Sequence, residues 1–67
     1  MKFIEFADIY SKCCYNASHI ICVGWSENTN VIYIETINKG FTHYFEDAEV
    51  AKFVYFNHIM GNLVEEV

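Results

Sequence analysis

Shortness limits this chain more than any other property, because 67 residues can build one small hydrophobic core and no more. A chain of this size buries only about 60% of the surface that its unfolded form exposes. Yet 54% of its residues are hydrophobic and 18% are aromatic, which is more than such a core can hide. We therefore expect a single domain over residues 1–67 with surplus apolar side chains on its surface. Because large exposed apolar patches usually mark contact sites, we also expect a homodimer.

The N-terminal segment has apolar side chains at three- and four-residue steps, which is the spacing of an amphipathic helix. Phe3, Phe6, Tyr10 and Cys13 form one stripe. The sequence therefore predicts a helix over residues 3–15.

The middle of the chain is rich in β-branched and aromatic residues, as strands are. Three such segments, at residues 19–25, 31–37 and 41–45, are predicted to be strands. The polar cluster at 26–30 separates the first two, and Asn38-Lys39-Gly40 is typical of a tight hairpin turn. This spacing predicts a three-stranded antiparallel meander.

A second helix is predicted after the third strand. Asp47 is a good N-cap, Glu49 lies in the first turn, where the helix dipole favours negative charge, and Gly61 is a natural C-cap. Its apolar residues do not share one narrow stripe, and residues 50–56 are also compatible with a strand. The predicted fold is α+β, with a three-stranded antiparallel sheet flanked by an N-terminal and a C-terminal helix in the order α-β-β-β-α.

The charge balance is acidic and contains no arginine. Four lysines stand against nine Asp and Glu residues, giving a net charge of −5. Nucleic-acid binding normally needs a basic face, so direct binding to DNA or RNA is not expected. An acidic surface fits a basic protein partner, such as a protein that itself handles nucleic acids, although acidity also serves solubility alone.

The cysteines indicate a reducing compartment. There are three, an odd number, and two of them are adjacent (Cys13 and Cys14), which does not resemble a secreted disulfide framework. The chain shows neither a signal-peptide pattern nor an apolar run of about 18 residues that could cross a membrane. We therefore expect a cytoplasmic protein without membrane contact, located in the host cytoplasm if it is viral.

The residues that could carry chemistry do not form a known pattern. No CxxC or HxxxH-like pair places two zinc ligands on one turn, so we predict no metal ligand and no cofactor. No Gly-rich nucleophile elbow or phosphate loop is present, and a chain this short leaves little room for a substrate pocket. We therefore predict no catalytic residue and no enzyme. The potential ligands considered were His19, His43, His58, Cys13, Cys14 and Cys22.

Aromatic and acidic side chains are the strongest candidates for a contact surface. Aromatic residues dominate interface hot spots, and three of them are expected to be exposed, at a strand end, in the third strand and on the free side of the second helix. An acidic group at the start of that helix could meet Lys or Arg on a partner. Core packing and helix capping are the ordinary alternatives for the two groups. The candidate partner-binding residues are Trp25, Tyr44, Tyr55, Glu46, Asp47 and Glu49.

Three features follow one another along the chain: a serine and a β-branched strand ending in Gly-Trp (18–25), a glycine turn before an aromatic strand (40–45), and Phe-Asn followed by Ile (56–59). In these features residues 18–60 resemble the KTSC family of short bacterial and phage domains. RNA binding has been suggested for that family, so the resemblance implies a nucleic-acid-binding module.

The chain also resembles, in general style, small phage proteins that inhibit host defence or transcription machinery, including anti-CRISPR-like proteins. They are short, acidic, poor in Arg and rich in Asn, Ile, Phe and Tyr. The function we predict is a non-enzymatic protein-binding domain that inhibits a host defence or nucleic-acid-handling protein through an acidic and aromatic surface. The alternatives are the KTSC-like nucleic-acid-binding module and an oligomer that sequesters a small ligand at a subunit interface.

Overall fold

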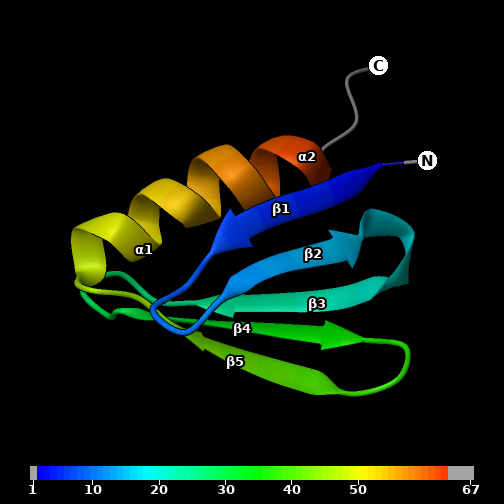
Figure 1. The fold of residues 1–67 in the computed structure, drawn as a ribbon, viewed down its shortest axis with the longest axis horizontal. Helices are drawn as coiled ribbons and strands as arrows, with labels where there is room; N and C mark the ends of the chain where they lie inside the picture. Colours follow the sequence, from blue (N-terminus) through cyan, green and yellow to red (C-terminus); the bar gives the residue numbers. More distant parts are fainter. Residues whose placement is uncertain (1, 64–67) are drawn as a thin grey trace.

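The computed structural model describes residues 2–63, which form a β-hairpin, a three-stranded antiparallel sheet and one C-terminal helix (Figure 1). This arrangement is α+β. None of the helices in the described range is long and apolar enough to cross a membrane. The strands are β1 (Phe3–Ala7), β2 (Lys12–Asn16), β3 (Ile20–Trp25), β4 (Val31–Thr36) and β5 (Gly40–Tyr44), with a 3-10 turn η1 (Ala17–His19) between β2 and β3. The helix comprises α1 (Ala48–Val54), a π-helical segment η2 (Tyr55–Met60) and α2 (Gly61–Leu63).

The predicted N-terminal helix over residues 3–15 is wrong, and with it the α-β-β-β-α order. The segment is an antiparallel hairpin in which Phe6 faces Cys13 across the two strands. Its burial alternates along β1, with Ile4 and Phe6 buried and their neighbours exposed, which is the two-residue period of a strand. Asp8 makes the turn: its Oδ1 accepts hydrogen bonds from the Tyr10 and Ser11 amides at 2.8 and 2.9 Å.

The predicted three-stranded meander is confirmed, with small differences at the strand ends. The strand order is β3-β4-β5, and both neighbouring pairs are antiparallel. The inner face of the sheet carries Ile32 and Ile34, which are fully buried. Between them Tyr33 points to the opposite face, where its ring lies over Gly40; a Cβ at that glycine would stand 2.0 Å from the Tyr33 hydroxyl.

The C-terminal helix begins as predicted and ends differently. Asp47 is its N-cap, because the Asp47 carboxylate accepts a hydrogen bond from the Val50 amide at 2.9 Å. Residues 50–56 are helical, so the strand alternative is wrong. The predicted C-cap at Gly61 is also wrong: its φ is −60° and the helix continues through it to Leu63.

The π-helical segment explains why the apolar residues of this helix share no narrow stripe. Ala51 and Val54 are buried at ordinary helical spacing, and the next buried residue is Ile59, five positions after Val54. Five residues is the hydrogen-bond step of a π-helix. The wider turn therefore keeps Ile59 on the inner side of the helix, where a regular α-helix would present His58.

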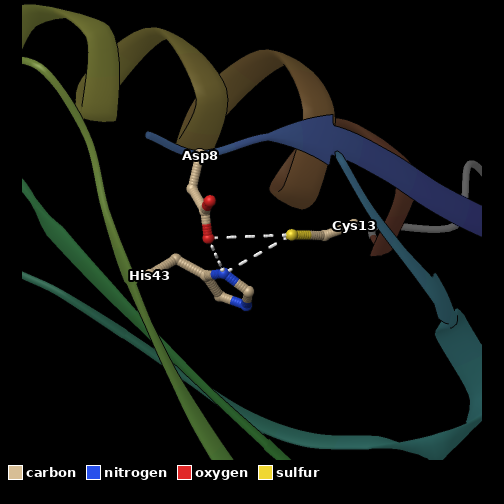
Figure 2. Close-up of side chains that lie close together, drawn as sticks. All are labelled: Asp8, Cys13 and His43. Atoms are coloured by element: carbon tan, nitrogen blue, oxygen red, sulfur yellow. Dashed lines mark hydrogen bonds and ion pairs between the residues drawn. The ribbon is translucent and has the colours of Figure 1, made fainter. Parts of the chain in front are cut away.

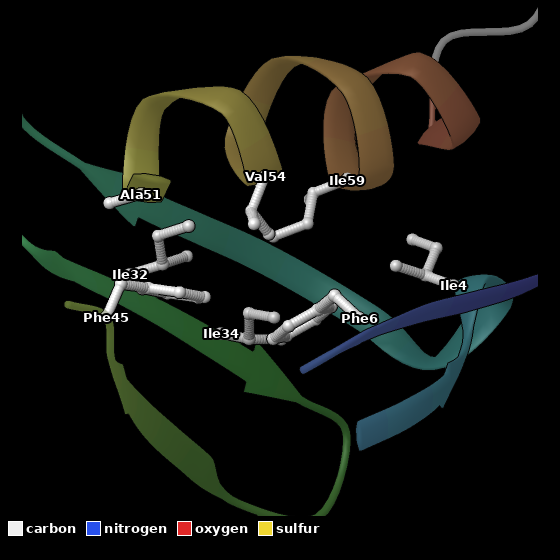
Figure 3. Close-up of a cluster of buried hydrophobic side chains, with 8 residues drawn as sticks. All are labelled: Ile4, Phe6, Ile32, Ile34, Phe45, Ala51, Val54 and Ile59. Carbon is white, nitrogen blue, oxygen red and sulfur yellow. The ribbon is translucent and has the colours of Figure 1, made fainter. Parts of the chain in front are cut away.

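The core lies where the helix, the sheet and the hairpin meet. Figure 3 shows the side chains of the three units pointing toward one another, with those of the helix above those of β4 and β1. The hairpin closes one side of the space between helix and sheet, because η2 packs on β1. The buried cluster is Ile4, Phe6, Ile32, Ile34, Phe45, Ala51, Val54 and Ile59.

Candidate functional site

The structure brings two of the predicted contact aromatics together and places the third elsewhere. Trp25, at the end of β3, stacks on Tyr55 of η2 with ring centroids 4.6 Å apart. Both side chains are half-buried and pack against the core, so the prediction that they are exposed is wrong. Tyr44 is 43% exposed, as predicted. It lies at the end of β5, where its ring meets that of Tyr10 from the hairpin turn.

The three acidic candidates lie at the junction between β5 and the helix. The Asp47 carboxylate is engaged in the N-cap, whereas Glu46 and Glu49 are exposed. Capping therefore accounts for one member of the group, and two carboxylates remain available to a partner.

Sequence reasoning missed the most exposed aromatic side chains of the helix. Phe53 and Phe56 are 59% and 52% exposed, and Val50 is 38% exposed. These three residues follow one another at three-residue steps, so they lie along one side of the helix; we call them the helix face. Phe56 also contacts Trp25 at a centroid distance of 5.4 Å, so its ring packs against the Trp25–Tyr55 stack.

A second candidate site, which the sequence analysis did not find, is a buried polar cluster between the hairpin and β5 (Figure 2). His43 of β5 is 6% exposed, and its Nδ1 lies 2.7 Å from Oδ2 of Asp8. The Cys13 sulfur lies 3.6 Å from the same nitrogen and 3.7 Å from the same carboxylate oxygen. On the other side of the ring, His43 Nε2 is hydrogen-bonded to the Tyr15 hydroxyl.

Strand geometry explains how residues 30 or more positions apart in sequence meet at this cluster. Cys13 and Tyr15 are two residues apart on β2, so their side chains leave the same face of the hairpin. The hairpin turn is anchored to the sheet by a hydrogen bond of 2.9 Å from the Ile9 amide to the Tyr44 carbonyl. This contact sets Asp8, the first residue of the turn, beside His43, the residue that precedes Tyr44.

The electrostatics of the cluster favour an ionised Asp8 carboxylate, a protonated Cys13 thiol and a protonated Tyr15 hydroxyl. Burial by itself raises the pKa of the Asp8 carboxyl, but hydrogen bonds from His43 and from the turn amides outweigh it and hold that pKa below its usual value. Burial raises the pKa of the Cys13 thiol, and the charge of Asp8 raises it further. Burial likewise raises the pKa of the Tyr15 hydroxyl to about 12.

This arrangement is not that of an activated nucleophile. An ionised carboxylate only accepts hydrogen bonds, so the His43 Nδ1 proton points at Asp8 and is not a lone pair that could deprotonate Cys13. In the neutral ring Nε2 then accepts the proton of the Tyr15 hydroxyl. A raised thiol pKa keeps Cys13 protonated, whereas nucleophilic cysteines have lowered pKa values. The cluster without a bound ion is therefore a closed hydrogen-bond network.

Tyr15 should make the protein sensitive to alkali. Because its pKa is about 10 in the unfolded chain and about 12 in the folded one, its contribution to stability is complete below pH 10. That contribution is lost as the pH rises through about 12. We expect the difference in free energy of unfolding between the wild type and Tyr15→Phe to shrink over this range in urea titrations. A difference that stays constant across this pH range would contradict the assignment.

The sequence offers only a faint signal for the polar cluster. An Asp followed by Ser three residues later is a turn pattern, and Cys13 and Tyr15 are on one face only if that turn is recognised. Nothing local to His43 indicates that it faces them, because that contact depends on how the hairpin docks on the sheet.

Comparisons with known proteins identify no relative from which either site could be interpreted. A scan against protein-family models found no match, and searches of curated proteins and of solved structures found none either. The resemblance to the KTSC family stays a prediction.

Proposed function

We propose that this chain is a non-enzymatic protein-binding domain that docks on a basic protein through the helix face and the acidic residues beside it. The observation that carries the proposal is the exposure of Phe53 and Phe56 on one side of the helix. Neighbouring exposed phenylalanines form an apolar patch, and such patches usually mark contact sites. Covering the exposed part of each ring with apolar side chains of a partner would add to the free energy of binding.

The shape of the helix face favours a specific contact. Phe56 rests on the stacked rings of Trp25 and Tyr55, so its position is restricted before a partner arrives. Aromatic anchors held in place in this way lose little conformational entropy on binding and are typical of interface hot spots.

The charge next to the helix face argues for a basic partner. Glu49 is exposed and lies four residues before Phe53, so the two side chains are neighbours on the helix surface. Glu46 adds a second exposed carboxylate just before the helix. Charges at the rim of an apolar contact steer association and select partners of opposite sign. Proteins that handle nucleic acids commonly carry such basic surfaces, and inhibition of one of them is the role we propose.

The experiment is an affinity capture from host-cell lysate followed by titration of the purified partner. We expect one basic protein to be retained by the wild type. The double variant Phe53→Ser/Phe56→Ser should weaken its binding by about tenfold or more for each phenylalanine, because hot-spot truncations cost more than 1.4 kcal/mol. Charge reversal with Glu46→Lys/Glu49→Lys should weaken binding mainly at low salt.

Matched control variants lie on the hairpin and the sheet. Phe3→Ser removes another exposed phenylalanine, and Glu5→Lys/Glu35→Lys reverses two other exposed carboxylates. We expect these controls to bind as the wild type does. The proposal fails if no protein is retained, if the retained protein is acidic, or if the controls weaken binding as much as the helix-face variants.

Self-association and the two alternative functions remain separate predictions. Sedimentation at micromolar concentration tests the homodimer, and Tyr44→Ser tests whether the outer face of the sheet forms it.

Salt-sensitive RNA binding in a gel shift would favour the KTSC-like function over ours. Two of the lysines lie at separate places, Lys39 over the Phe41 ring and Lys52 beside Glu27, which is not the continuous basic strip that RNA requires. A thermal-shift screen of nucleotides tests sequestration of a small ligand.

A further inference from the structure

We propose that Asp8, Cys13 and His43 form a zinc-binding site with three protein ligands and one open position. The three side chains offer a carboxylate oxygen, a sulfur and an imidazole nitrogen, and these atoms lie within 4.8 Å of one another. All three are ligand types that zinc takes in proteins. The inference is independent of the proposed docking function, because the cluster involves neither the helix face nor Glu46 and Glu49.

Two of the three distances between the ligand atoms fit the edges of a zinc tetrahedron. With zinc–ligand bonds of about 2.0–2.3 Å, tetrahedral geometry puts the sulfur about 3.6 Å from each of the other two ligand atoms. The observed separations are 3.6 Å from Cys13 Sγ to His43 Nδ1 and 3.7 Å from Cys13 Sγ to Asp8 Oδ2. The third edge, between Nδ1 and Oδ2, is 2.7 Å and would have to open to about 3.4 Å. A proton now joins these two atoms, and a metal ion would replace it.

The groups that surround the ligands already hold them as a metal site does. Ligating carboxylates and imidazoles use their remaining atoms in hydrogen bonds that fix their orientation. Oδ1 of Asp8 accepts from the Tyr10 and Ser11 amides, which leaves Oδ2 directed into the cluster. Nε2 of His43 is engaged by the Tyr15 hydroxyl, which leaves Nδ1 as the coordinating nitrogen.

Binding is balanced by the release of one proton. Zinc takes the thiolate of Cys13, so the thiol proton passes to solvent. The proton on His43 Nδ1 exchanges to Nε2, which then donates to the Tyr15 oxygen instead of accepting from it. A cleft of about 350 Å³ is lined by all three ligands and by Tyr15, Phe41 and Thr42. We place the fourth position on this cleft, where a water molecule would complete the tetrahedron. Three protein ligands and an accessible fourth position are the arrangement of an open zinc site.

The test uses the full chain, reduced and stripped of metal with a chelator. Titration with Zn²⁺ should show one ion per chain, and Co²⁺ should give the absorption of a tetrahedral site together with a thiolate-to-cobalt charge-transfer band. Cys13→Ser should abolish that band and weaken Zn²⁺ binding by about 100-fold or more. Tyr15→Phe should weaken it about 10–100-fold, as loss of an outer hydrogen bond to a ligand does.

Control variants separate this site from adventitious binding to thiols and imidazoles. Cys22→Ser and His19→Gln change exposed residues outside the cluster and should leave affinity and the cobalt spectrum unchanged. Absence of the charge-transfer band in the wild type would overturn the proposal without any variant, so a Cys13→Ser chain that fails to fold cannot obscure the result. Equal loss of binding in Cys22→Ser would also overturn it.

Discussion

Replacing Asp8 with alanine should lower the free energy of unfolding by about 3 kcal/mol or more, because each hydrogen bond to an ionised carboxylate contributes about 1.5–3 kcal/mol and several are lost together. The substitution removes the acceptor of the Tyr10 and Ser11 amides and leaves the Nδ1 proton of His43 buried without its partner. For a small domain this is a large part of the total, which is about 5–15 kcal/mol for natural proteins. Urea denaturation with a chelator present measures the loss for the metal-free chain.

Asp47→Ala is the matched control, because that carboxylate also accepts a backbone amide but touches no buried ring. Loss of an N-cap costs about 1 kcal/mol, so the two variants should differ by about 2 kcal/mol or more. Asp8→Asn should fall between them: its amide oxygen can still accept from the turn amides, but its NH₂ group opposes the His43 proton. Equal losses for Asp8→Ala and Asp47→Ala would mean that Asp8 only forms a turn.

The sheet and the start of the C-terminal helix could be predicted because their signals are local. Asn38-Lys39-Gly40 marks the turn between β4 and β5, and Asp47 marks the first turn of the helix. The helix prediction for the N-terminal segment is wrong because the apolar residues of this segment match two different periods. Phe3, Phe6 and Tyr10 match a helical stripe, whereas Ile4 and Phe6 match a strand, and burial follows the strand. The turn at Asp8 decides between the two periods, because its side-chain oxygen caps amides that a helix would have used otherwise.

The two candidate sites differ in how much of each could be predicted from the sequence. The acidic residues Glu46 and Glu49 were found because a capping pattern drew attention to the helix start. Phe53 and Phe56 were not singled out, because the side of the helix that faces the core is set by tertiary packing and by the π-helical step that turns Ile59 inward. The polar cluster needed tertiary packing: Asp8 and His43 are joined only when the hairpin turn docks on β5.

Replacing Ile34 with alanine should lower the free energy of unfolding by about 2–5 kcal/mol, through lost burial and the cavity left behind. Ile34 is fully buried on the inner face of β4, between the helix and the hairpin (Figure 3). Its cross-strand partners are Val23 and Phe41, so the space cannot be refilled without moving a neighbouring strand. Urea denaturation at neutral pH measures the change.

Ile37→Ala removes the same atoms from a side chain that is 61% exposed and should change stability by only about 0.5 kcal/mol. The comparison tests whether buried and exposed side chains have separate roles, stability for the first and binding for the second, as both proposals assume. If Ile34 is costly and Ile37 is not, the core among helix, sheet and hairpin carries the stability, and the exposed phenylalanines of the helix face are free to serve binding. If the two substitutions cost the same, the hairpin does not close the core. In that case the position of His43 beside Asp8, and with it the zinc geometry, would lose its structural basis.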